Sequence, residues 1–238
     1  MLKKGYPLSA FWAYSYKGLN HDTGLPEFNL PYQLDENGNI MKDNNGNPMF
    51  TGVSEYTDFL VYAGKAEPDF TGGLTTRVRW KGLTFGANFA LLLGATKRLP
   101  NPYTGTKLPL SSKNLDKDLL KRWKNPGDEA YTDIPSLFTG QISEYVTLPL
   151  QQTDVLYSMW SNSDVRLVKA DFFRCQQMSL TWNVDERWCA RVGIKSLQLN
   201  ATMNNVFVIA SKKFNGFDPE LGNSVQPKTY SFGVNIGF

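Results

Sequence analysis

The chain has 238 residues, of which 41% are hydrophobic and 20% are charged, and this balance excludes a disordered protein. The formal net charge is only +3, and no run of Lys and Arg exceeds two residues, so nucleic-acid binding is disfavoured. Aromatic residues reach 13%, which favours β structure.

The longest apolar stretch, 89–95, is far shorter than the ~20 residues that a membrane-spanning helix needs. A barrel strand needs only about 10 residues with apolar side chains at alternate positions. The start, Met1–Lys4, resembles a signal peptide, but Pro7 and Ser9 interrupt the apolar segment that should follow. A barrel protein of a bacterial outer membrane carries an export signal. If this chain is part of such a barrel, we therefore expect it to begin within a longer protein.

The first predicted strands alternate apolar and polar side chains. One lies near Leu8–Tyr16, with Trp12 and Tyr14 on the same face. A hairpin follows, in which 74–81 and Leu83–Leu93 flank a tight turn at Lys81-Gly82.

Three further strands are predicted at Val165–Val184, Ser196–Ala210 and the C-terminus, with one turn of helix in Asp185–Gly193. The last strand has a strict period of two. Its apolar positions are Tyr230, Phe232, Val234, Ile236 and Phe238.

These patterns predict an all-β fold: an antiparallel up-and-down sheet of about six long strands, forming part of a transmembrane β-barrel. The short links, Lys81-Gly82 and Asp185–Gly193, fall on one side, and the long links, about 17–70, 95–164 and 211–227, fall on the other. Outer-membrane barrels show this asymmetry between periplasmic turns and external loops. Six strands alone leave two open edges, so we expect further strands to close the barrel.

Several short motifs, in this order and spacing, resemble the C-terminal part of SusC/RagA-type TonB-linked outer-membrane transporters. The departures from the family pattern are Phe173 and Cys175. The segments that carry the resemblance are Gly18–Gly24, Pro68–Leu74, Arg122–Asp128, Val168–Arg174, Met178–Trp182, Asn204–Phe207, Gly216–Glu220 and Pro227–Gly233.

The resemblance implies that residues 1–238 are the C-terminal segment of a plugged barrel of about 22 strands. The plug and the N-terminal domains of such a receptor would be absent from this segment. The implied function is the import of nutrients, glycans or peptides, across the bacterial outer membrane. The implied partners are outer-membrane lipid and, only for the full-length protein, a SusD-like lipoprotein and the TonB complex.

The expected site residues belong to the membrane. The terminal alternation that ends at Phe238 resembles the signal read by the outer-membrane insertion machinery. Interfacial aromatic residues are predicted at Trp12 and Tyr14 on one side of the membrane and at Trp80 and Trp182 on the other. Loop aromatics would either stack on a sugar or pack against a lipoprotein, and both alternatives stay open for Tyr103, Trp123, Tyr131 and Trp160.

Enzymatic and metal chemistry are disfavoured, so no catalytic residue, metal or cofactor is predicted. The triplet Asp22-Thr23-Gly24 occurs once, whereas aspartic proteases need two carboxylates. His21 is the only histidine, and Cys175 and Cys189 are predicted to be unpaired. The series Asp35, Asn37 and Asn39 lacks the Gly and Glu of a calcium loop.

Two other functions remain open from the sequence. A passive porin-like barrel would share the strands but would need no segment that contacts TonB. A soluble carbohydrate-binding β-sandwich would be monodisperse without detergent. The sequence does not identify the substrate.

Overall fold

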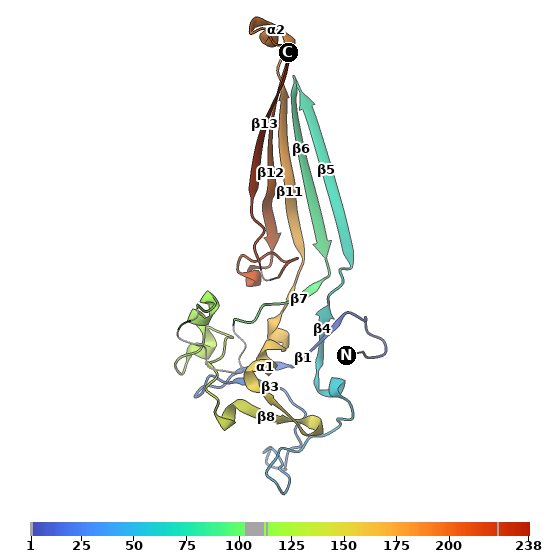
Figure 1. Ribbon diagram of the computed structural model, residues 1–238. Helices are drawn as coiled ribbons and strands as arrows, with labels where there is room; N and C mark the ends of the chain where they lie inside the picture. The colour runs from blue at the N-terminus through green and yellow to red at the C-terminus, as the bar shows by residue number, and fades with distance from the viewer. Residues whose placement is uncertain (1, 103–111, 113, 223) are drawn as a thin grey trace. The chain divides into compact units, whose positions relative to one another are not determined.

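The computed structural model describes residues 2–102, 112, 114–222 and 224–238. The chain divides into two compact units (Figure 1). Unit 1 consists of Met1–Ala66 and Arg98–Val168, and unit 2 consists of Glu67–Lys97 and Lys169–Phe238.

Unit 2 contains one five-stranded sheet with the strand order β13-β12-β11-β6-β5 (Figure 1). Every neighbouring pair is antiparallel. The predicted all-β, antiparallel up-and-down sheet is therefore confirmed. The strands are β5 (Phe70–Trp80), β6 (Leu83–Leu93), β11 (Phe172–Asn183), β12 (Ser196–Ala210) and β13 (Thr229–Gly237).

The short connections meet at one end of this sheet, here called the turn end. The β5–β6 turn contacts β11, because the Asn183 backbone N–H donates to the Gly82 carbonyl over 2.9 Å. The β11–β12 link contains α2 (Glu186–Arg191), and Lys195 N donates to the Gly237 carbonyl over 2.7 Å. The opposite end, the loop end, carries the two long connections between strands of this sheet, β6 to β11 and β12 to β13, so the predicted sorting is confirmed for these links. The predicted link 17–70 does not join two strands of the sheet, because the strand expected before it lies in unit 1.

The tight turn at Lys81-Gly82 requires glycine. Lys81 and Gly82 have φ values of 42° and 82°, as in the primed hairpin turns. A Cβ at Gly82 would lie 2.6 Å from the Asn183 carbonyl oxygen, closer than van der Waals contact allows. The turn therefore fixes β5, β6 and β11 in one register.

We expect Gly82→Ala to lower the free energy of unfolding by about 1–3 kcal/mol, because it combines a strained φ with a backbone clash. Gly193→Ala is the matched control, since Gly193 has a φ of 75° but a Cβ added there would meet nothing within 4 Å. Thermal unfolding followed by far-UV circular dichroism compares the two. Equal losses would show that the contact with Asn183 has no energetic role.

The sheet has five long strands among the described residues, and the sixth strand predicted near Leu8–Tyr16 is wrong. That segment contains only the four-residue β1 (Ala10–Ala13), which pairs with β4 in unit 1. The adjacent residues Ala13 and Tyr14 are both buried there, and Tyr14 belongs to the core of unit 1. The long strand predicted at Val165–Val184 is also divided, since β10 ends at Lys169 and β11 begins at Phe172.

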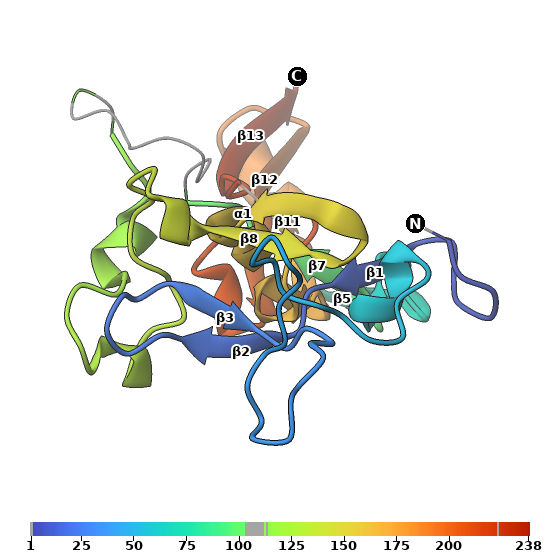
Figure 2. The same cartoon turned by 90° about the horizontal axis from the view of Figure 1, so that it is seen from below.

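Unit 1 is built from short strand pairs and helical turns around a core of its own. The antiparallel pair of β2 and β3 is visible in Figure 2. The strands outside the sheet of unit 2 are β1, β2 (Tyr16–Leu19), β3 (Pro26–Phe28), β4 (Val61–Lys65), β7 (Thr96–Arg98), β8 (Tyr145–Leu148), β9 (Gln152–Val155) and β10 (Leu167–Lys169). The helices of unit 1 are α1 (Leu156–Ser161) and the 3-10 helices at Tyr56–Phe59, Lys117–Lys121, Asp128–Ala130, Ile142–Glu144, Pro149–Gln151 and Asp164–Arg166. A further 3-10 helix, Lys212–Phe214, belongs to unit 2.

The core of unit 1 is aromatic. Trp160 and Met159 of α1 are fully buried, and the Tyr14 hydroxyl lies 3.1 Å from that of Tyr56. Long stretches that the sequence predicted as loops therefore fold into a compact unit. The buried cluster is Tyr14, Phe28, Phe59, Leu148, Tyr157, Met159 and Trp160.

Candidate functional site

One face of the five-stranded sheet, here called the apolar face, is hydrophobic across all five strands. The register aligns Trp80, Leu83, Trp182, Leu199 and Val234 in a single row across the sheet. Further rows of the same face join Val78, Phe85, Leu180, Ala201 and Phe232, then Leu74 and Phe89 on β5 and β6, and Ala87, Met178, Met203 and Tyr230 on the inner strands and β13.

The apolar face is open rather than buried. Val78 is 62% exposed, Val234 is 60% exposed and Phe232 is 83% exposed. A soluble monomer rarely exposes a contiguous apolar patch of more than a few hundred Å², whereas here the patch spans a whole sheet. A surface of this kind needs an apolar medium or partner to cover it.

The length of the strands suits a bilayer. β5 and β6 each have 11 residues. At ~3.3 Å per residue and a tilt of about 40°, such a strand spans a height of roughly 27 Å, close to the ~25 Å apolar band of outer-membrane barrels. The mean strand of a soluble protein is only about 5–6 residues long.

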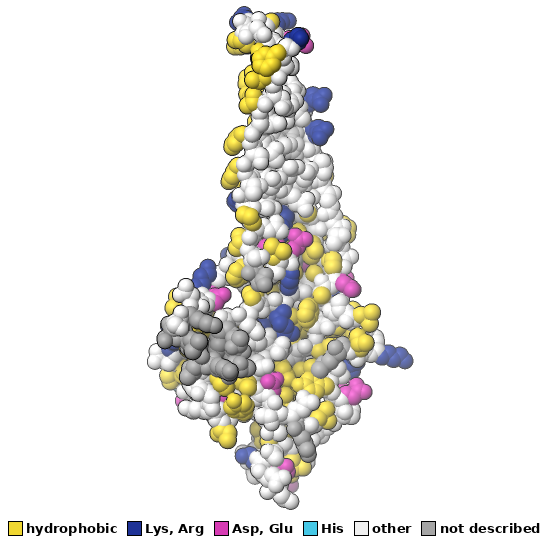
Figure 3. Space-filling view, in the orientation of Figure 1, with side chains coloured by type: hydrophobic (Ala, Val, Ile, Leu, Met, Phe, Trp, Pro, Cys, Tyr) yellow, Lys and Arg dark blue, Asp and Glu magenta, His cyan; other side chains and the backbone are white. Residues whose placement is uncertain are grey.

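The opposite face of the sheet, here called the polar face, carries amides, hydroxyls and Arg side chains. Neighbouring strands are joined there by side-chain hydrogen bonds, as between Asn88 and Gln177 at 3.1 Å. In Figure 3 the surface of the sheet toward the viewer is mostly white, with yellow side chains at its margin. Further bonds of this kind join Asn183 to Gln198 at 2.7 Å, Gln198 to Asn235 at 3.0 Å and Asn204 to Thr229 at 3.0 Å.

Two of the predicted interfacial aromatics lie at one end of the apolar face. Trp80 and Trp182 are on the apolar face at the turn end, 63% and 44% exposed. Nearer the loop end of that face, Phe173 stacks on Phe89 with ring centroids 5.5 Å apart and lies 6.2 Å from Phe207. Phe85, Phe232 and Tyr230 lie in the rows between, so aromatic rings are spread along the apolar face.

Trp12 and Tyr14 lie in unit 1, outside the sheet. Tyr14 is buried in the unit 1 core, and this burial raises the pKa of its phenol. Trp12 packs against Tyr6 and Tyr62 at centroid distances of 4.8 and 6.1 Å. Both residues were predicted to be interfacial because a long barrel strand was expected near Leu8–Tyr16. The structure contains no such strand there, so the basis of that prediction is absent.

The loop aromatics have different positions. Trp160 is 0% exposed in the unit 1 core and Trp123 is also buried, so neither is available to stack on a sugar. Tyr131 is 92% exposed. Tyr103 lies outside the described residues.

The last strand, β13, forms one edge of the sheet. Its four alternating residues Tyr230, Phe232, Val234 and Ile236 lie on the apolar face, 49–83% exposed, and Phe238 is 81% exposed. The strand thus presents both an unpaired edge and an apolar face.

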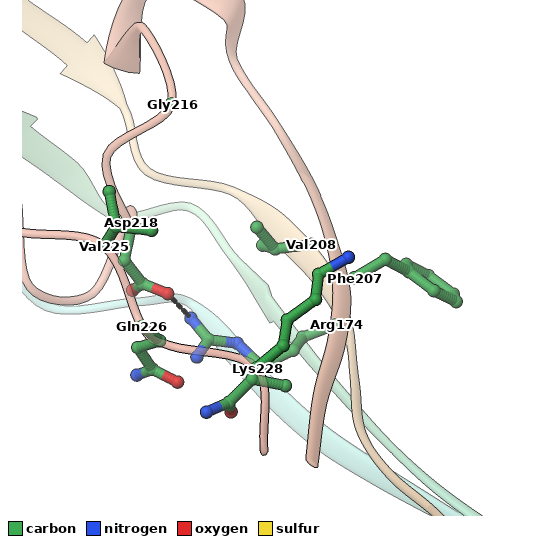
Figure 4. A pocket seen from close by; sticks show the side chains of 9 residues that line it. Arg174, Phe207, Val208, Gly216, Asp218, Val225, Gln226 and Lys228 are labelled. Atoms are coloured by element: carbon green, nitrogen blue, oxygen red, sulfur yellow. Dashed lines mark hydrogen bonds and ion pairs between the residues drawn. The ribbon is translucent and has the colours of Figure 1, made fainter. Parts of the chain in front are cut away.

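A buried ion pair lies on the polar face at the loop end, where it lines a cavity of about 130 Å³ (Figure 4). The Arg174 side chain is 5% exposed, and its guanidinium donates to Asp218 Oδ2 over 2.6 Å and forms an ion pair with Glu220 Oε2 at 2.9 Å. Asp218 also accepts the backbone N–H of Glu220 at 2.8 Å. Arg174 therefore holds the loop between β12 and β13 against β11, a pairing that the motifs at both residues did not reveal.

Two motifs that are far apart in the sequence meet in unit 1. The ring Nδ1 of His21 lies 2.6 Å from Glu129 Oε1, and Trp123 donates its ring N–H to Glu129 Oε2 over 3.1 Å. The Trp123 ring occupies the space that a Cβ at Gly24 would need. Asp22-Thr23-Gly24 is therefore part of a packed turn, which gives it a structural role.

The His21–Glu129 contact predicts a pH dependence. The hydrogen bond raises the pKa of His21 above 6.5 and lowers the pKa of Glu129 to about 2. The His21 contribution to stability is present below pH 6.5 and is lost as pH rises through the raised pKa, whereas the Glu129 contribution is present above pH 4.5 and is lost as pH falls toward 2. The His21–Glu129 pair therefore contributes its full stabilisation between pH 4.5 and pH 6.5.

We expect Glu129→Gln to return the His21 pKa toward its ordinary value, as followed by NMR titration of the imidazole, which belongs to the only histidine. Asp22→Asn is the control, because Asp22 contributes least to the raised pKa. A shift in Asp22→Asn as large as that in Glu129→Gln would contradict the assigned cause.

In the described part of the chain, no group of three or more His, Cys, Asp and Glu side chains is placed to hold a metal ion. Asp35 Oδ1 accepts the backbone N–H groups of Asn37 and Asn39, as in a turn. Cys175 and Cys189 are free and buried, as predicted.

In the described residues, no helix is long and apolar enough to cross a membrane.

The chain is similar over its length to TonB-dependent receptors. It is 24% identical over 240 residues to TonB-dependent receptor P3 of Formosa agariphila, covering 100% of this chain and 21% of the relative. It is 24% identical over 216 residues to receptor P39 of the same organism, covering 90% of this chain and 19% of the relative. The chain thus spans about a fifth of the length of these curated relatives. No protein-family model matches it.

The chain also matches solved structures of a peptide importer. The chain matches the RagAB peptide importer in its closed-closed state with a TM-score of 0.60 and 26% identity, over 98% of this chain and 23% of that one. A second structure, of the RagAB peptide transporter, matches with a TM-score of 0.59 and 25% identity, over 96% and 23%. The resemblance to SusC/RagA-type TonB-linked transporters that the motifs indicated is confirmed.

Proposed function

We propose that residues 1–238 are the C-terminal barrel segment of an outer-membrane TonB-dependent importer and contribute five strands to its wall. The observation that carries this proposal is the exposed apolar face on strands of bilayer length, with the short connections gathered at one end. The similarity to TonB-dependent receptors and to the RagAB peptide importer supports it.

In this proposal the two faces of the sheet have separate roles. The apolar face contacts outer-membrane lipid, with Trp80 and Trp182 at the periplasmic boundary. The polar face, with Arg77, Arg79 and the bonded amides, lines the interior and faces a plug supplied by the complete receptor. The loop end then lies on the external side, where long barrel loops occur.

The substrate class we favour is peptides, because the matched solved structures are of a peptide importer and transporter. Glycans are the other class that the family resemblance allows. A SusD-like lipoprotein and the TonB complex are proposed as partners of the complete receptor only. The protein is proposed to act in transport and not as an enzyme.

The alternatives have less support. Both curated relatives are named as TonB-dependent receptors, which disfavours a passive porin-like barrel. A carbohydrate-binding sandwich needs a second sheet against the first, but unit 2 contains a single long sheet among its described residues.

The mass of the native product tests the proposal. Outer membranes are fractionated and probed by immunoblot with an antibody against the 211–227 loop. A band in this fraction several times heavier than 26.8 kDa is expected. A band of 26.8 kDa alone would contradict membership of a full importer, and absence from the membrane fraction would contradict the barrel itself.

We propose also that Tyr230, Phe232, Val234, Ile236 and Phe238 form a membrane-assembly signal, because an edge strand with exposed apolar residues is able to pair with a template strand. Deleting Phe238 is expected to reduce the folded protein in the outer membrane about tenfold, the order of magnitude of a loss of ~1.4 kcal/mol in recognition. Tyr131→Ala, which removes an exposed aromatic ring outside the sheet, is the control. Unchanged insertion without Phe238 would contradict this role.

A further inference from the structure

The turn end of the sheet carries a second feature, a cavity between the hairpin turn and the α2 loop. Its volume is about 590 Å³, within the range of small-molecule sites. Trp182, which belongs to the apolar face, also lines this cavity. The cavity therefore opens where the apolar face ends. Its lining residues are Lys81, Gly82, Trp182, Asn183, Val184, Asp185 and Trp188.

The helix beside the cavity, α2, exposes a large apolar side chain. Cys189 is 1% exposed, whereas Trp188 and Val192 are 66% and 71% exposed. Trp188 and Val192 are four residues apart and share one side of the helix, and Arg187 and Arg191 share the adjacent side. The loop thus turns aromatic, aliphatic and cationic groups outward together.

Cations lie on the aromatic rings at this end. Lys81 Nζ is 5.1 Å from the Trp80 ring centroid, and Arg191 Cζ is 5.8 Å from that of Trp188. Figure 3 shows yellow and dark blue side chains together over the α2 region. Tryptophan rings and snorkelling cations are the groups that mark a membrane–water boundary.

Two cations border the cavity. Lys81 lines it, and Arg191 Cζ lies 5.8 Å from the ring of Trp188, which also lines it. Asp185 is the acid among the lining residues. The Asp185 carboxylate already accepts the Arg187 backbone N–H over 2.9 Å as the cap of α2. Lys81 and Arg191 thus lie beside the apolar rings of the cavity wall, which fits a ligand with an anionic head and an apolar tail.

We infer that this cavity binds the headgroup of an anionic phospholipid, with the phosphate near Lys81 and Arg191 and the acyl chains descending along Trp182 onto the apolar face. The inference rests on the proposed function, because it requires that the apolar face contacts lipid. It adds a specific lipid class and a specific site to that function.

Native mass spectrometry of the complete protein in detergent tests the site, with phosphatidylglycerol and phosphatidylcholine as probes. The wild type is expected to retain phosphatidylglycerol in preference to phosphatidylcholine. Lys81→Gln with Arg191→Gln is expected to weaken phosphatidylglycerol binding about thirty-fold, which corresponds to about 1 kcal/mol for each cation near a membrane surface.

Two further variants make the outcome decisive. Arg191→Gln alone leaves the hairpin turn intact and is expected to weaken binding about five-fold, which corresponds to about 1 kcal/mol for one cation. Lys212→Gln with Lys213→Gln removes the same charge in the β12–β13 loop and is expected to leave binding unchanged. Equal retention of both lipids by the wild type, or equal losses in all three variants, would overturn the inference. A protein that inserts into membranes without lipid preference would overturn this inference alone, whereas failure to insert would contradict the proposed function.

Discussion

Phe89→Arg is expected to lower the free energy of unfolding in a bilayer by about 2–4 kcal/mol, the cost of a lipid-facing Arg near the membrane midplane. Phe89 lies on the apolar face near the middle of β6, where its ring stacks on that of Phe173. Equilibrium unfolding in denaturant from lipid vesicles measures this loss.

The adjacent residue provides the matched control. Asn88 lies on the polar face and donates to Gln177. Asn88→Arg is expected to cost about 1 kcal/mol, roughly the value of one hydrogen bond, because the new charge remains in the polar interior. Equal costs at positions 88 and 89 would contradict the assignment of the two faces.

Asp218→Ala is expected to lower the free energy of unfolding by about 3 kcal/mol, because it leaves the buried guanidinium of Arg174 without its closest partner. Glu220 lies 2.9 Å from the same guanidinium but has a side chain that is 48% exposed, so it compensates only in part. Glu220→Gln is therefore expected to cost at most about 1 kcal/mol.

A double-mutant cycle isolates the ion pair. Arg174→Met removes the charge that Asp218→Ala would strand, so the double variant is expected to cost less than the sum of the single variants. Protease cleavage in the loop between β12 and β13 should rise in Asp218→Ala, since this ion pair fastens the loop to β11. Additive losses, or an unchanged loop, would contradict the role of the pair.

Much of the sheet was predictable from the sequence because its pattern is local. In a strand with one apolar face, apolar side chains recur every two residues, so β5, β6, β12 and β13 can be recognised in the sequence without knowledge of their neighbouring strands. The turn at Lys81-Gly82 is equally local, since its backbone conformation requires glycine.

Unit 1 was not predictable because its elements are short and its contacts are distant. The alternation around Trp12 and Tyr14 has the period of a barrel strand, yet Tyr14 packs in a core whose other members range from Phe28 to Trp160. Four-residue strands and 3-10 turns give no extended period from which to recognise them.

The polar contacts of the site also depend on long-range pairing. Arg174 and Asp218 are 44 residues apart, and His21 and Glu129 are 108 residues apart. An Arg flanked by Phe172, Phe173 and Cys175 was the available signal for the first pair, since a buried charge needs a partner. Its partner could be identified only from the structure.

The most direct test of the central claim is the environment of each side chain along β6 in the membrane. Single cysteines at successive positions of 83–93, in a background with Ser at positions 175 and 189, are spin-labelled and exposed to oxygen, which concentrates in lipid, and to a water-soluble nickel chelate. We predict that labels at positions 85, 87, 89 and 91 meet oxygen and that labels at 84, 86, 88 and 90 do not, in a strict period of two. Access of the nickel chelate to both sets would contradict a lipid-facing sheet.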